Sequence, residues 1–135
     1  MSVTLTDQDR LTLRTAAYGA VTLLAAAGAG GRPGAHRIAT DGSIALASAT
    51  GLVGHVLADK STGVKLNGKS VAAIADHVLP ALTAAMSLLN EQDPAEADNF
   101  RGTVVLAIET ATHRGDPSPT LADMTRKITA ALDAV

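Results

Sequence analysis

A short segment in the middle of the chain has the residue types and spacing of a phosphate-binding loop. Residues 63–70 read Gly-Val-Lys-Leu-Asn-Gly-Lys-Ser and match the P-loop pattern G-x-x-x-x-G-K-[ST]. In such a loop, backbone amides surround the phosphates, the lysine neutralises their charge, and the last hydroxyl binds Mg²⁺. The candidate phosphate-binding residues are therefore Gly63, Gly68, Lys69 and Ser70.

The residues around this segment favour a polar turn instead. A P-loop follows a buried strand, whereas residues 59–62 read Asp-Lys-Ser-Thr. The apolar run 104–109 ends in an acid, like the metal-holding strand of such proteins, but it reads on without a break as one helix would. We therefore interpret Gly68 as a turn residue and Ser70 as a helix N-cap. Nucleotide or phosphate binding by residues 63–70 is kept as the alternative function.

The four histidines do not predict a metal or catalytic site. No His or Cys partner stands at metal-ligand spacing from His36, His55, His77 or His113, and the chain has no cysteine. His55 and His113 each lie four residues from a carboxylate, which is typical of a surface ion pair on a helix. We expect no metal and no cofactor. A third hypothesis is an enzyme or small-ligand protein with a site between helices near Pro80, and no motif supports it.

The composition predicts an all-α protein. Ala and Leu dominate the apolar residues, which make up 47% of the chain, and the only aromatic residues are Tyr18 and Phe100. Ala and Leu favour helix, whereas the β-branched and aromatic residues that a sheet needs are scarce. A length of 135 residues fits one domain. We expect a compact single-domain bundle of about five helices over residues 1–135.

Five segments have a helical spacing of apolar residues or a helix start signal. A Gly-rich loop is expected between the first two, over residues 28–42. The second segment, residues 43–59, is the least regular because Gly51 and Gly54 disfavour helix, and a buried strand over residues 51–58 is its alternative. The expected helices cover residues 7–27, 43–59, 70–89, 93–113 and 118–135.

Charge and hydropathy do not indicate a nucleic acid or a membrane as the partner. The formal net charge is −2, and neither half of the chain is strongly basic. The uncharged stretch 15–31 is shorter than a membrane span, and the acids before it do not fit a signal peptide. We therefore expect a small cytoplasmic protein, and the abundance of Ala, Gly and Arg suggests a bacterial source. No further motif points to a known family.

The small size of the apolar residues leads to the functional prediction. Burial of Ala contributes much less free energy than burial of Leu, so pairing two copies through an Ala/Leu face would add useful apolar burial. We predict that the protein acts through self-association, as a homodimer, or through binding a protein partner. An enzyme is the less favoured reading. The expected faces are Ala16, Ala20 and Leu23, or Leu121, Met124 and Ile128, and either set could instead be monomer core.

Overall fold

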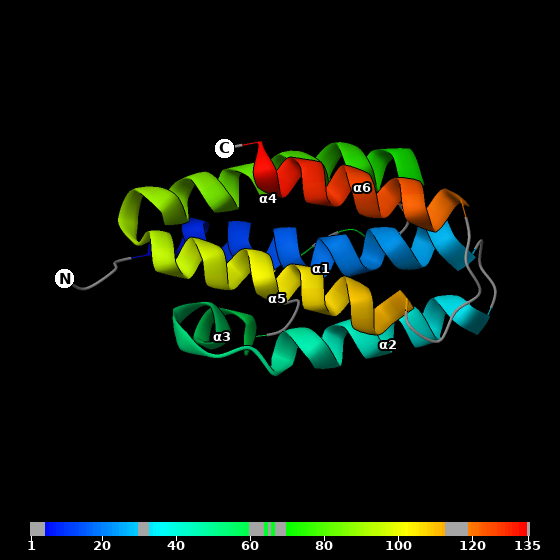
Figure 1. Cartoon of the computed structure of the whole chain (residues 1–135), viewed down its shortest axis with the longest axis horizontal. Helices are drawn as coiled ribbons and strands as arrows, with labels where there is room; N and C mark the ends of the chain where they lie inside the picture. Colours follow the sequence, from blue (N-terminus) through cyan, green and yellow to red (C-terminus); the bar gives the residue numbers. More distant parts are fainter. Residues whose placement is uncertain are drawn as a thin grey trace.

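Six helices make up the described part of the chain (Figure 1). The computed structural model describes residues 5–29, 33–59, 64, 66, 70–112 and 119–134. Within these ranges there is no strand, and the predicted all-α bundle is confirmed, with six helices in place of about five. They are α1 (Asp7–Ala29), α2 (Pro33–Ala47), α3 (Gly51–Leu57), α4 (Val71–Gln92), α5 (Pro94–Thr112) and α6 (Pro119–Asp133).

Helix α1 is the centre of the bundle, because it packs against each of the other five helices. In Figure 1, α4 and α6 lie on one side of α1, and α2 and α3 lie on the other. Every residue of α1 from Thr15 to Ala25 is buried except Thr22. A helix surrounded in this way needs small and medium apolar residues on all sides, which the Ala/Leu composition supplies.

The helix starts follow familiar capping chemistry. The amide of Asp9 donates to the hydroxyl of Thr6 at 3.0 Å, and the amide of Thr6 donates back to the Asp9 carboxylate at 3.1 Å. This reciprocal pair satisfies two amides that the first turn of α1 would otherwise leave free. Proline at the first helical position opens three further helices, where its missing amide costs nothing. These residues are Pro33, Pro94 and Pro119.

The segment predicted as a Gly-rich loop is the largest correction. Residues 33–42 of the expected loop belong to α2. Burial of Ile38 and Leu46 against the bundle outweighs the weak helix propensity of the glycines. A Cβ atom at Gly42 would come within 2.8 Å of the Val21 side chain, so this glycine permits a close approach of α2 to α1. The residue that suggested a loop is thus a packing residue.

The predicted helix over residues 43–59 is divided in two. Helix α2 ends at Ala47, and α3 begins at Gly51, whose φ of 71° lies in the left-handed region that favours glycine. The alternative of a strand over residues 51–58 is wrong, because α3 occupies this segment.

Helix α3 is capped from a distant helix. The Thr50 side chain makes no cap hydrogen bond. Instead, the Glu96 carboxylate of α5 accepts from the amide of Val53 at 3.1 Å. The side-chain amide of Asn99 donates to the Thr50 carbonyl at 2.9 Å. These contacts join the N-terminus of α3 to α5 and place a negative charge at the positive end of the α3 dipole.

Helix α4 is the longest apolar element after α1. It runs through Pro80 without a break and buries Ile74, Val78 and Leu82 in the bundle. Among the described residues it is the one helix that is long and apolar enough, by length and composition, to cross a membrane. The core helix of a water-soluble bundle meets the same two criteria.

Candidate functional site

The described part of the P-loop-like segment is a helix start. Gly63, Gly68 and Lys69 lie outside the described residues. The Ser70 side chain accepts a hydrogen bond from the amide of Ala73 at 3.1 Å, so Ser70 is the N-cap of α4. The interpretation of Ser70 as a cap is therefore confirmed.

The elements on either side of the pattern are also helical. The segment before it is α3 followed by a turn at Ala58 and Asp59, whereas a P-loop needs a buried strand there. The run 104–109 lies within α5. Residues 60–62, directly before the pattern, lie outside the described residues; the described part shows a helix and a turn leading towards them, and a helix over the run 104–109.

We expect no binding in an isothermal titration of the wild-type protein with ATP and Mg²⁺. The reason is that α3 and a turn lead towards the loop, whereas in P-loop proteins a strand aims the loop amides at the phosphates. Lys69→Ala should leave the free energy of unfolding within about 0.5 kcal/mol of wild type, as is usual for surface substitutions. A micromolar affinity for ATP that disappears in Lys69→Ala would contradict the prediction and restore the nucleotide-binding alternative.

The titratable residues that the structure describes do not form a cluster that could hold a metal ion. In the part of the chain that the structure describes, no group of three or more His, Asp or Glu side chains could hold a metal ion. His55 and His77 are exposed, while His113 and the side chain of His36 lie outside the description. Every buried side-chain nitrogen or oxygen among the described residues has a hydrogen-bond partner. The described side chains thus contain no unsatisfied polar group that would mark a catalytic pocket.

The closest ion pair joins two helices at the surface. Both oxygens of the Asp133 carboxylate accept from the Arg101 guanidinium, at 2.7 and 3.1 Å, and this hydrogen bonding lowers the pKa of Asp133. The pair connects α5 to α6. Because both side chains are exposed, its contribution to stability is small.

The two faces predicted for association belong to the monomer core. Ala16, Ala20 and Leu23 are each 0% exposed, because α1 is surrounded by the other helices. The second set, on α6, is also buried, since α6 packs against α1 and α4. Its members are Leu121, Met124 and Ile128. The prediction that either face is available to a partner is therefore wrong.

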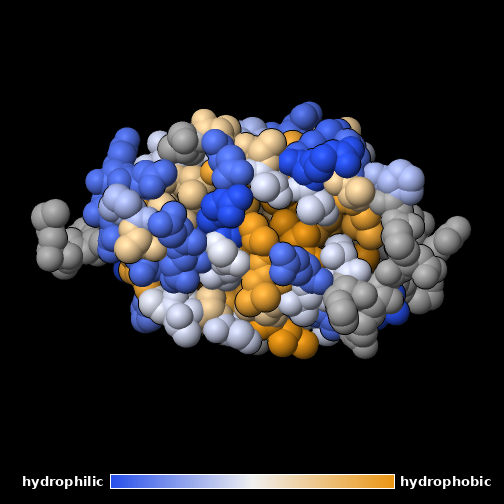
Figure 2. Space-filling view, viewed as in Figure 1, coloured by the Kyte–Doolittle hydropathy of each residue, from blue (hydrophilic) through white to orange (hydrophobic). Residues whose placement is uncertain are grey.

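Other large apolar side chains are exposed. Ile44 on α2 is 61% exposed and Leu106 on α5 is 54% exposed, and these two helices pack against each other. Figure 2 shows hydrophobic surface gathered near the middle of the face on which α5 lies. Ser48, one turn beyond Ile44, lines the same hollow as Leu106, so the two exposed side chains border one continuous surface.

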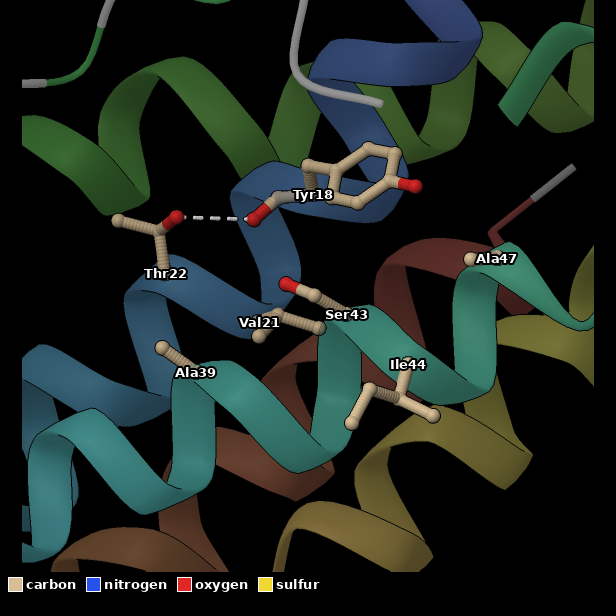
Figure 3. A pocket seen from close by; sticks show the side chains of 7 residues that line it. All are labelled: Tyr18, Val21, Thr22, Ala39, Ser43, Ile44 and Ala47. Carbon is tan, nitrogen blue, oxygen red and sulfur yellow. Dashed lines mark hydrogen bonds between the residues drawn. The ribbon is translucent and has the colours of Figure 1, made fainter. Parts of the chain in front are cut away.

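The C-terminal half of α2, residues 40–47, lies between two hollows on the surface and is called the ridge below. The hollow beside α5 has a volume of about 380 Å³ and is lined by Ser48, Gly102 and Leu106 among others. The hollow beside α1 has a volume of about 390 Å³ (Figure 3). Its walls are mostly apolar, and burial raises the pKa of the one phenol in them. The lining residues are Tyr18, Val21, Thr22, Ala39, Ser43, Ile44 and Ala47.

The ridge itself carries no exposed charge. From Thr40 to the end of α2 the exposed residues are uncharged, and Asp41 is half-buried. Charged side chains surround the region: Arg37 towards the start of α2, Asp98 in the lining of the hollow at α5, and Glu109 further along α5. An uncharged centre with a charged border is typical of a protein–protein interface.

One glycine on this surface has no explanation within a single chain. Gly102 is exposed in the middle of α5, and a Cβ atom there would meet nothing within 4 Å. By contrast, a Cβ at Gly19 would come within 2.6 Å of Val78. Glycine costs about 1 kcal/mol relative to alanine inside a helix. Its absent side chain allows a second backbone to approach α5 closely at Gly102.

The sequence contained a signal for one of the two exposed side chains. The buried residues of α5 include Phe100, Val104 and Ile108, and this spacing leaves Leu106 on the opposite side of the helix. Ile44 could not be found in the same way, because the start of its helix was predicted as a loop.

Comparison of the chain with protein-family models, with curated proteins and with solved structures finds no match.

Proposed function

We propose that this protein functions by associating with a second copy of itself through the α2/α5 surface, which consists of Ile44, Ala47, Ser48, Gly102 and Leu106. One observation carries the proposal. The two most exposed large apolar side chains among the described residues lie on adjacent helices, and Ser48 and Gly102, which lie between them, are uncharged.

Burial of this surface would stabilise a dimer. Full burial of an isoleucine or leucine side chain contributes roughly 1.5–3 kcal/mol. In a two-fold dimer each residue is buried twice, once from each copy. Neither Ile44 nor Leu106 brings a charge whose desolvation would offset the gain.

A second copy suits the border of the surface as well as its centre. The border carries a positive side chain, Arg37, on α2 and two exposed negative side chains, Asp98 and Glu109, on α5. A surface that carries both signs can pair with its own copy, whereas a surface of one sign would repel it. Arg37 of one copy can therefore meet an acid on α5 of the other.

Sedimentation equilibrium at tens of micromolar is expected to give twice the monomer mass of 13.6 kDa. Leu106→Lys should shift the protein to the monomer, because the interface would then bury an unpaired charge. The matched control is Val71→Lys, which changes a 36% exposed apolar residue on α4 outside the α2/α5 surface. This variant should remain dimeric.

Two results would count against this function. A single wild-type species at 13.6 kDa would rule out self-association and leave a different protein as the partner to test. A dimer that both lysine variants preserve would show that the chain associates through another surface.

A further inference from the structure

We infer that in this dimer Ile44 of each copy inserts into the hollow between α1 and α2 of the other copy. The inference rests on the proposed self-association and names the contact that forms it. Ile44 stands at the edge of this hollow and is 61% exposed (Figure 3).

Three small residues on α2 create the hollow. Ala39, Ser43 and Ala47 follow one another at intervals of four residues, so they lie along one face of the helix. The close contact of Gly42 with Val21 holds α2 against α1 at the same level of the bundle. Short side chains on a helix that is held close leave a space that the described residues do not fill.

The opposite wall is rigid. The hydroxyl of Tyr18 donates to the carbonyl of Leu57 at 2.8 Å, which fixes the phenol ring between α1 and the end of α3. The hollow measures about 390 Å³, many times the volume of one water molecule in the liquid, about 30 Å³. An isoleucine side chain therefore has room beside the ring of Tyr18.

The hydrogen bonding in the hollow suits an apolar occupant. The hydroxyl of Thr22 donates to the carbonyl of Tyr18 at 2.9 Å, and the Tyr18 hydroxyl is bonded to Leu57. Covering these two groups with an aliphatic side chain leaves both hydrogen bonds intact. The half-buried hydroxyl of Ser43 is the third in the lining, and the occupant must leave it in contact with water or with a polar group of the partner. The ridge supplies an aliphatic side chain of this kind in Ile44.

The position of Ile44 beside its own hollow suits a two-fold pair. In a dimer with a two-fold axis, a contact from the first copy to the second is always repeated from the second to the first. If the axis passes between Ile44 and the hollow, Ile44 of each copy therefore meets the hollow of the other. Another ligand could fill the hollow but would leave Ile44 exposed. A second copy of this chain uses both features with the same pair of contacts.

Two variants test the contact from its two sides. Ile44→Ala removes the inserted side chain and keeps the hollow. Ala47→Leu keeps Ile44 and places a larger side chain in the hollow. Each homodimer then lacks both contacts, so its dissociation constant should rise about 100-fold, at roughly tenfold per contact. Both positions are exposed in the monomer, and circular dichroism should show unchanged helix content.

Mixing the two variants is the decisive experiment. The heterodimer regains one contact, because Ile44 of the Ala47→Leu chain enters the open hollow of the Ile44→Ala chain. With one chain fluorescently labelled, fluorescence-detected sedimentation should find it about tenfold tighter than either variant alone. An unspecific apolar contact gives no such recovery. Should Ala47→Leu fail to fold, Ala39→Leu, which narrows the same hollow, takes its place in the mixture.

The single tyrosine gives a second measurement on the unlabelled protein. The chain has one Tyr and no Trp, so its intrinsic fluorescence reports on Tyr18, in the wall of the hollow. When the wild type is diluted until the dimer dissociates, the Tyr18 emission should change. The midpoint concentration of that change should equal the midpoint of the fall in average mass measured by sedimentation.

The outcomes separate this inference from the proposed function. A wild-type monomer overturns both. A dimer that Leu106→Lys disrupts, but that Ile44→Ala and Ala47→Leu leave unchanged, overturns the insertion of Ile44 and keeps the α2/α5 surface. Recovery in the mixture supports both.

Discussion

Phe100→Ala is expected to lower the free energy of unfolding by about 3–5 kcal/mol. Phe100 on α5 is 0% exposed, is the largest of the fully buried side chains, and is one of the two aromatic residues of the chain. Its removal would leave a cavity that the surrounding small aliphatic residues fill poorly. Because domains of this size are stable by only about 5–15 kcal/mol, the variant should lose a large fraction of its stability.

The measurement is urea unfolding followed by circular dichroism, at concentrations low enough to keep the protein monomeric. Leu106→Ala is the matched control, since it shortens an apolar residue of the same helix that is 54% exposed. It should cost less than about 1 kcal/mol. A loss below 1 kcal/mol for Phe100→Ala would show that α5 does not pack as described.

Local chemistry was enough to predict the fold class and four of the helices. Ala and Leu favour helix, and the prolines that open α5 and α6 mark their starts before any packing is known. In α4 the apolar residues Ile74, Val78 and Leu82 recur at helical spacing, and they form the face that the bundle buries. These features depend on residues that are near one another in sequence.

Glycines caused the errors because their role depends on distant residues. Gly42 permits contact with Val21 on another helix, and Gly51 supplies a φ of 71° between two helices. Gly102 lies in a regular helix with open space around it. The same residue type therefore stands for a close crossing, a turn and an exposed helix position, and the local sequence does not distinguish the three.

The association surface was beyond sequence reasoning for a similar reason. A helical stripe shows which residues are apolar, but the rest of the fold decides whether its own chain covers them. Ala16 and Ala20 are covered because α1 is central, whereas Ile44 and Leu106 are left exposed. Identifying the surface required the relative positions of α1, α2 and α5.

Gly54→Ala should be the most damaging of the glycine substitutions, with a loss of more than about 2 kcal/mol. A Cβ atom at this position would clash with the carbonyl oxygen of Ala49 and lie 2.5 Å from its carbonyl carbon. Both are backbone atoms, so relief requires a shift of α3 rather than a side-chain rotation. Overpacking of this kind typically costs 1–3 kcal/mol and occasionally more.

The best control is Gly102→Ala, which makes the same chemical change in a helix where a Cβ meets nothing within 4 Å. It should raise the stability of the monomer by up to about 1 kcal/mol, because alanine favours helix. Urea unfolding gives both values, and hydrogen exchange should show the lost protection concentrated in α3. If Gly54→Ala proved as stable as Gly102→Ala, α3 could not lie against the Ala49 backbone. The contacts of Glu96 and Asn99 with the start of α3 would then also need revision, because they depend on the same placement.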